Sequence, residues 1–168
     1  MLLEQAQKEF FAENGFLRVP GVLSPEKLRA IQAETDRVVQ AASGVEDHNE
    51  IYDLEASHKP NAPRVRRIKT PHLHFSAFED LVRDTDLTDP VAGLIGEDIR
   101  LYGGKINIKA AGYGAPVEWH QDWAFYPHTN DDVLTVAIML DDMDADNGSL
   151  GIMAGSHKGP IFDHHADG

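Results

Sequence analysis

The hydrophobic pattern of this chain changes near residue 100, and this change constrains the fold more than any other feature. Before it, residues 2–14, 24–44, 76–82 and 90–95 have helical spacing, with serine caps at Ser24 and Ser76. After it, residues 105–109 alternate and residues 134–140 are nearly all apolar, which predicts one half-buried and one fully buried strand. Helices followed by closely spaced strands indicate an α+β jelly-roll.

The remaining segments predict the domain organisation. They include a short strand candidate at residues 16–19, an irregular loop at residues 43–63, and turns at residues 146–148 and 155–159. The 168 residues fit one domain and contain no internal repeat. We expect a single domain that is mainly helical over residues 1–98 and holds the first core strands over residues 99–168.

Composition excludes several classes of function. The net charge of −13, from 28 acidic and 15 basic residues, repels phosphate backbones and anionic lipids, so we expect no nucleic-acid or membrane partner. The chain has no cysteine, which excludes disulfides, zinc–cysteine sites and thiol nucleophiles. It also has no signal pattern and no apolar run near the ~20 residues of a membrane span, and we expect a cytoplasmic protein.

His120 and Asp122 are the candidate metal ligands. In an extended segment, side chains two residues apart face the same side, so both could reach one ion and open into one cavity. Together with a third ligand, they would leave positions open for a co-substrate and O₂, as in iron sites with two histidines and one carboxylate. The same spacing recurs at residues 165–167 and 48–50. Only the first pair follows a strand candidate and a glycine-rich turn.

Four blocks around this pair resemble the phytanoyl-CoA dioxygenase family. They are HQDWAFYPHTNDD at residues 120–132, LDDM at 140–143, NGSL at 147–150 and GSHKG at 155–159. The resemblance implies a double-stranded β-helix, Fe(II) held by His120 and Asp122, and 2-oxoglutarate and O₂ as co-substrates. It further implies a dioxygenase that hydroxylates a small organic substrate and releases succinate and CO₂.

The resemblance also implies two residues that this sequence does not contain. In the family, a second iron-binding histidine and an arginine that pairs with 2-oxoglutarate come tens of residues later. We therefore expect the C-terminal part of the core to lie beyond residue 168, and residues 105–153 to form at least three antiparallel strands. Two alternatives stay open: a non-catalytic β-helix fragment, or a cupin-like metal-binding module that uses His164 or His165. His157, in the GSHKG block, is a third histidine that could replace the missing ligand.

Three further residues are candidates for binding 2-oxoglutarate by the same resemblance. Lys69 and Lys105 occupy positions that contact or line the co-substrate pocket in the family, and Gln121 lies between the two ligands. A lysine ammonium pairs with a carboxylate as a point charge. The alternatives are solvated surface charges for the lysines and structural hydrogen bonding for Gln121.

Two side-chain clusters have open interpretations. Arg64, Arg66 and Arg67 precede Lys69 in an otherwise acidic chain, which fits either internal pairing with carboxylates or a small anionic substrate. Aromatic side chains flank the metal pair and favour a core position over a substrate wall. They are Trp119, Trp123, Phe125 and Tyr126.

Overall fold

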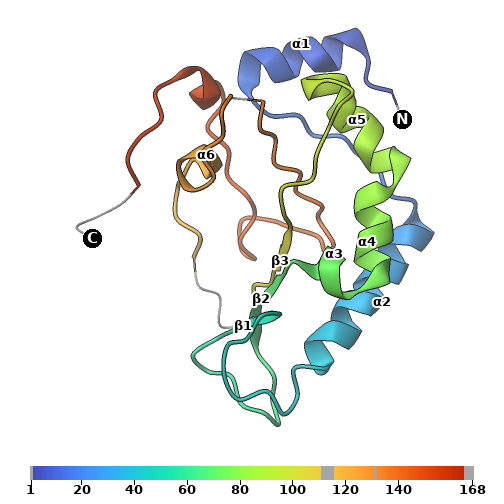
Figure 1. Cartoon of the computed structure of the whole chain (residues 1–168), viewed down its shortest axis with the longest axis vertical. Coiled ribbons are helices and arrows are strands. Elements are labelled where there is room, and N and C mark those ends of the chain that lie inside the picture. The colour runs from blue at the N-terminus through green and yellow to red at the C-terminus, as the bar shows by residue number, and fades with distance from the viewer. Residues whose placement is uncertain (1, 111–115, 131, 165–168) are drawn as a thin grey trace.

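The computed structural model describes residues 2–110, 116–130 and 132–164. Its helices are α1 Gln5–Asn14, α2 Pro25–Gln40, α3 Pro71–His74, α4 Ser76–Arg83, α5 Thr85–Ile95, α6 Asp122–Phe125 and the 3₁₀ helix η1 Ser156–Lys158. Its strands are β1 Tyr52–Leu54, β2 Val65–Lys69 and β3 Lys105–Asn107. Figure 1 shows α1, α2, α4 and α5 along one side, the sheet beside them, and largely irregular chain on the other side.

Helix α2 begins and packs as its sequence predicts. The Ser24 hydroxyl accepts a hydrogen bond from the Lys27 N–H at 3.1 Å, and Pro25 occupies the first turn, where it sacrifices no helical hydrogen bond. Ile31 and Val38 are two helical turns apart, so they lie on the same face of α2, and both are buried. The predicted end at Gly44 is late, because the helix ends at Gln40 and a turn continues to Gly44.

A small antiparallel sheet in the order β1-β2-β3 completes the core. Its inner face carries Tyr52, Leu54, Val65 and Ile68, all buried against α2 and against Phe78 of α4. The Tyr52 hydroxyl donates to the Val38 carbonyl at 2.8 Å, so this buried polar group is satisfied. Strand β1 lies inside the predicted loop, and β2 was not predicted because three of its five residues are charged.

The helices after the sheet start at different residues from those predicted. Ser76 is the first residue of α4 and makes no cap, since Phe75 precedes the helix. Helix α5 starts at Thr85 rather than Pro90, because the Asp84 carboxylate accepts the Asp86 N–H at 2.9 Å and caps it. Its end at Gly96 is as predicted. Within the described residues, no helix is both long and apolar enough to cross a bilayer.

The strand predicted at residues 134–140 is wrong. The described residues of this segment are irregular and none is buried. Residues 16–19 also form no strand, and between residues 105 and 153 only β3 is a strand in the described part of the chain. Strand propensity requires a neighbouring strand to pair with. Leu140 anchors the end of this segment to α2, because its carbonyl accepts from Gln32 Nε2 at 2.6 Å.

The accessible surface is large for a chain of this mass. It measures 11925 Å² for 18.6 kDa. A folded monomer of that mass exposes roughly 8,200 Å², so the excess is roughly 3,700 Å². Most of the large apolar side chains that are exposed lie after residue 100. The first half of the chain therefore encloses a core, whereas the second half presents apolar surface to solvent.

Candidate metal centre

The structure brings the two predicted metal ligands together. His120 lies directly before α6, and Asp122 is the first residue of that short helix. The His120 Nε2 and Asp122 Oδ1 atoms are 3.3 Å apart, and each side chain is about one-third exposed. The pair is adjacent because the chain turns into α6, not because it lies on a strand as the sequence suggested. A ligand could reach both atoms from solvent.

Hydrogen bonds orient both side chains toward each other. His120 Nδ1 lies 2.7 Å from the Glu118 carbonyl, which only accepts, so Nδ1 carries the proton. In a neutral imidazole, Nε2 then presents its lone pair to Asp122 Oδ1. The other carboxylate oxygen, Oδ2, accepts from the Thr135 hydroxyl at 2.6 Å. Two acceptors that face each other repel unless a proton or a metal cation lies between them, so the arrangement can hold either one.

The pair fits two coordination positions of a first-row divalent metal ion. Imidazole nitrogen and carboxylate oxygen bind such ions at about 2.1 Å, so two ligands at a right angle are roughly 3.0 Å apart. The 3.3 Å between His120 Nε2 and Asp122 Oδ1 is close to that value. Among the described residues, however, no group of three histidine, cysteine or acidic side chains is placed to share an ion.

His164 lies near the pair, but its two ring nitrogens are already used. Nδ1 donates to the Phe162 carbonyl at 2.7 Å, and Nε2 accepts the Gln121 N–H at 2.9 Å. The Phe125 ring lies between the two histidines, at 6.0 Å from His120 and 5.5 Å from His164 between centroids. His164 thus supports the chain around the pair and does not complete it in this arrangement.

Of the two remaining histidine candidates, only His157 lies within the described residues, and it is turned toward another part of the chain. His157 Nε2 lies 3.1 Å from the Ala12 carbonyl, which places this ring against α1. His165 is outside the described residues.

Gln121 connects the metal pair to the end of the described chain. Its Nε2 donates to the Pro160 carbonyl at 3.0 Å, and its Oε1 accepts the Phe162 N–H at 2.8 Å. The sequence left two interpretations of Gln121 open, structural hydrogen bonding and binding of 2-oxoglutarate. The two bonds seen here are of the structural kind. Both ends of the carboxamide hold residues 160–162 next to the segment that carries His120.

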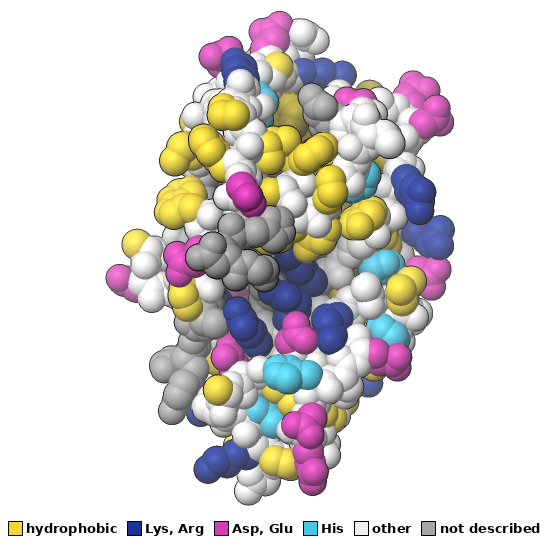
Figure 2. Space-filling view, turned by 60° about the vertical axis from the view of Figure 1, so that its left-hand side comes forward, with side chains coloured by type: hydrophobic (Ala, Val, Ile, Leu, Met, Phe, Trp, Pro, Cys, Tyr) yellow, Lys and Arg dark blue, Asp and Glu magenta, His cyan; other side chains and the backbone are white. Residues whose placement is uncertain are grey.

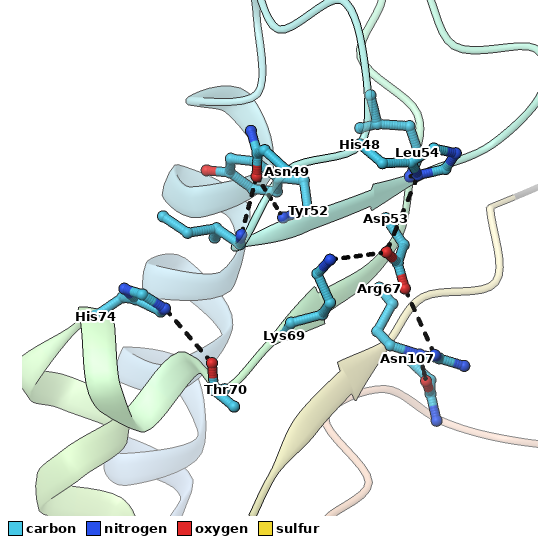
Figure 3. Close-up of polar contacts among 11 residues, drawn as sticks. His48, Asn49, Tyr52, Asp53, Leu54, Arg67, Lys69, Thr70, His74 and Asn107 are labelled. Carbon is cyan, nitrogen blue, oxygen red and sulfur yellow. Dashed lines mark hydrogen bonds and ion pairs between the residues drawn. The ribbon is translucent and has the colours of Figure 1, made fainter.

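Lys69 and Lys105 lie at paired positions on the outer face of the sheet. In Figure 3, Asp53 lies between Lys69 and Arg67, with Oδ1 3.2 Å from Lys69 Nζ and Oδ2 3.5 Å from Arg67 Nη1. The predicted internal pairing with carboxylates therefore holds for these two cations. Lys105 Nζ lies 5.9 Å from the centroid of the Tyr126 ring, and Tyr126 directly follows α6, the short helix that begins with Asp122.

Thr70 is a residue that the sequence did not single out. It follows Lys69 and has φ 42°, a left-handed conformation that is rare for a β-branched side chain. Its N–H donates to the Gly104 carbonyl at 3.0 Å, which links the end of β2 to the residue before Lys105. Thr70 therefore fixes the relative position of the two lysines. Nothing in its residue type signals this backbone conformation.

The aromatic side chains around the pair are not core residues. Trp119 is 70% exposed, and Phe125 and Tyr126 are also exposed. Trp123 Nε1 donates to the Asn130 carbonyl at 3.3 Å. The prediction of a core position is wrong for the first three, because no element of the described chain packs over α6. Their exposed parts could contact a further segment or a ligand.

Comparison with known proteins identifies the family. The sequence pattern described as Phytanoyl-CoA dioxygenase (PhyH) matches residues 11–168. The chain belongs to the phytanoyl-CoA dioxygenase family. This assignment confirms the resemblance seen in the blocks after residue 119.

Several curated relatives within this family are dioxygenases by name. A probable alpha-ketoglutarate-dependent hypophosphite dioxygenase from Stutzerimonas stutzeri is 42% identical over 164 residues, 98% of this chain and 56% of the relative. L-proline trans-4-hydroxylase from Streptomyces griseoviridis is 30% identical over 91% of this chain and 55% of that protein. Ectoine dioxygenase from Nocardia farcinica is 29% identical over 90% and 50%. The chain spans about half the length of these relatives.

A solved structure has the same fold. The crystal structure of EctD from S. alaskensis with bound Fe superposes with a TM-score of 0.61 at 19% identity, covering 74% of this chain and 42% of EctD. A second EctD structure, with 2-oxoglutarate and 5-hydroxyectoine, matches equally well. At this identity the likeness concerns the fold alone. The described α+β arrangement is thus similar to the fold of EctD.

Proposed function

We propose that this chain is the iron-binding part of an Fe(II)- and 2-oxoglutarate-dependent dioxygenase that hydroxylates a small molecule. The observation that carries the proposal is the His120–Asp122 pair, whose Nε2 and Oδ1 atoms are 3.3 Å apart and oriented by separate hydrogen bonds. Relatives named for hypophosphite, ectoine and L-proline support the reaction class, because all three are oxygenases of small molecules.

In this proposal His120 Nε2 and Asp122 Oδ1 hold the iron, and the surrounding chain orients them. The Glu118 carbonyl keeps the proton on His120 Nδ1, and Thr135 fixes the plane of the Asp122 carboxylate. When bound, Fe(II) and 2-oxoglutarate activate O₂ so that one oxygen atom enters the substrate and the other enters succinate, with loss of CO₂. Lys69 and Lys105 supply positive charge for the carboxylates of 2-oxoglutarate.

We further propose that the chain contributes the first part of a double-stranded β-helix. The roughly 3,700 Å² of excess surface, and the lack of a neighbouring strand beside residues 134–140 in the described chain, support an incomplete core. In the proposal, a segment outside this sequence pairs with residues 134–140, covers the exposed apolar side chains, and brings the second histidine and the arginine of the family. The chain's coverage of about half of its relatives fits this arrangement.

One alternative function has an observation in its favour. The described residues offer no third ligand, which fits a non-catalytic fragment that binds metal weakly and turns nothing over. The cupin-like module has less support, because both ring nitrogens of His164 are engaged in hydrogen bonds to the backbone. Turnover separates the two functions, whereas metal binding does not.

Succinate release tests the proposal. We would measure it for the 168-residue chain and for a form extended by the downstream coding sequence, with Fe(II), ascorbate and 2-oxoglutarate, and with hypophosphite, ectoine or L-proline. We expect substrate-linked succinate from the extended form only, and none from its His120→Ala variant. If the extended form binds Fe(II) but releases no succinate with any substrate, the non-catalytic alternative is correct. Robust turnover by the short chain would show that one of its own residues completes the site.

A further inference from the structure

We propose that a cavity at the outer edge of β2 and β3 binds a small oxyanion and forms the substrate subsite of the dioxygenase; its role as a substrate subsite rests on the proposed function. The cavity is lined by Arg66, Arg67, Asn107, Ile108, Lys109 and Val117. Three of these six side chains are cations and none is a carboxylate. Nothing in the resemblance assigns a role to this combination.

The sheet fixes the middle of the cavity. Arg67 and Asn107 are direct partners across β2 and β3, and Arg67 Nε donates to Asn107 Oδ1 at 3.1 Å. On the opposite side, Arg67 Nη1 is 3.5 Å from Asp53. The guanidinium is therefore held from two directions, and its position does not depend on a ligand. Arginine in a fixed orientation is well suited to oxyanions, because its N–H groups point in parallel.

The other two cations have no charged partner in the described structure. Arg66 and Lys109 form no ion pair within 4.0 Å with any described residue. Lys109 passes over Gly148, where a Cβ atom would lie 2.8 Å from Nζ, so the turn at residues 145–148 limits its freedom. Figure 2 shows Lys and Arg side chains gathered in a hollow near the middle of one face. In a chain with net charge −13, cations left unpaired together favour an external anion.

The size of the cavity selects the ligand. Its volume is about 20 Å³, whereas a single water needs roughly 10–15 Å³ by the same kind of measure. That volume admits one or two oxygen atoms of an oxyanion, and a five-carbon dicarboxylate such as 2-oxoglutarate does not fit within it. Net positive charge without a carboxylate also disfavours zwitterions, whose ammonium group would meet Arg66 and Lys109. The geometry therefore selects a small inorganic oxyanion over an amino acid.

A short stretch of chain connects the cavity to the metal pair. Val117 lines it, and His120 follows three residues later. Three residues of extended chain span at most about 11 Å, which limits the distance between the two Cα atoms. The chain therefore keeps Val117, and with it one wall of the cavity, within about 11 Å of His120 by Cα distance.

Anion binding can be measured without iron or 2-oxoglutarate. We would titrate the chain into sodium hypophosphite and follow the phosphorus resonance by NMR, for wild type and for Arg66→Gln and Lys109→Gln. Each variant removes a charge-assisted hydrogen bond, so we expect binding weaker by about tenfold or more. Arg29→Gln on α2 removes the same charge from an exposed position elsewhere and should bind as wild type. Circular dichroism of each variant checks the fold.

Competition separates this cavity from the co-substrate site. We expect 2-oxoglutarate at the same concentration to leave hypophosphite binding unchanged. The proposal is overturned if no binding is detected, if Arg29→Gln weakens binding as much as the two cavity variants do, or if 2-oxoglutarate displaces the anion. Succinate release from the extended form with L-proline or ectoine, without anion binding, would reject the cavity and leave the dioxygenase intact. Anion binding by the chain, with no succinate released by the extended form, would support the cavity and reject the dioxygenase.

Discussion

The two halves of this chain use their apolar residues in opposite ways. All eight buried hydrophobic residues of the core lie between Ile31 and Phe78. In contrast, 15 of the 18 exposed large hydrophobic residues in the described chain lie between Leu101 and Phe162, and no described residue after Pro90 is buried. Both halves are rich in apolar side chains, but only the first supplies the partners that cover them. Apolar content alone therefore does not determine which part of a sequence encloses a core.

Each half of the chain also contributes different residues to the site. The first half contributes the cations of β2 and the carboxylate of Asp53, and all are fixed by the sheet. The second half contributes His120 and Asp122, which are positioned by local hydrogen bonds from Glu118 and Thr135. We therefore expect substitutions in the first half to act mainly on stability, and substitutions near the metal pair to act mainly on ligand binding.

The largest expected effect comes from the same substitution made once in each half. Ile68 on β2 is fully buried, so Ile68→Ala should lower the free energy of unfolding by about 2–5 kcal/mol through lost burial and a residual cavity. Ile152 is 49% exposed, and Ile152→Ala should change it by less than about 0.5 kcal/mol. Urea unfolding of both variants measures the difference. Equal losses would show that the second half packs as well as the first.

A smaller effect is expected at Thr135, which donates to Asp122 at 2.6 Å. Thr135→Val keeps the shape of the side chain and removes the hydroxyl. Loss of a hydrogen bond to a metal-binding carboxylate typically costs 10–100-fold in affinity, and we expect about tenfold weaker Fe(II) binding at this exposed site. Thr135→Ser restores the hydroxyl and should restore the affinity. If serine and valine behave alike, the bond to Asp122 is not what orients the carboxylate.

Sequence reasoning succeeded where the signal was local and failed where it depended on a partner. Ser24 as a cap of α2 and the adjacency of His120 and Asp122 follow from neighbouring residues, and both are seen. Residues 134–140 have strand composition but no neighbouring strand among the described residues, so that prediction is wrong. Strand β2 was missed for the opposite reason: its charged residues face outward while a partner on each side provides the pairing.

The polar clusters show the same limit. Lys69 and Arg67 could be recognised as cations, but their shared partner Asp53 lies on another strand and has no signal in the sequence. The donation from Thr135 to Asp122 spans 13 residues and was equally invisible. Lys69, Lys105 and Gln121 stay predictions as binders of 2-oxoglutarate.

The smallest effect concerns Asp84 in the first half, which caps α5 and pairs with Lys27 at 2.6 Å. The hydrogen bond from Lys27, aided by the Asp86 N–H, holds the pKa of Asp84 below its usual value. Because the folded pKa is lowered, this stabilisation is fully present above about pH 4 and is lost as the pH falls through the lowered pKa. Asp84→Ala should cost about 1 kcal/mol at pH 7 in urea unfolding.

Asp84→Asn serves as the matched control, because asparagine keeps the cap but cannot form the ion pair. It should cost less than alanine at pH 7, and its stability should fall less steeply than that of wild type as the pH is lowered from 5 to about 3. A wild-type profile that is parallel to the asparagine profile would show that the carboxylate charge contributes nothing.

Anaerobic titration with Fe(II) tests the central claim most directly. His120→Ala removes the proposed ligand, whereas His128→Ala is a matched control, because His128 Nδ1 also bonds the carbonyl two residues earlier but no described carboxylate lies within 4.0 Å of its ring. We expect wild type and His128→Ala to bind Fe(II) with similar affinity and His120→Ala to bind at least about 100-fold more weakly. Equal affinity in all three proteins would contradict the assignment of His120 and Asp122 as the iron site.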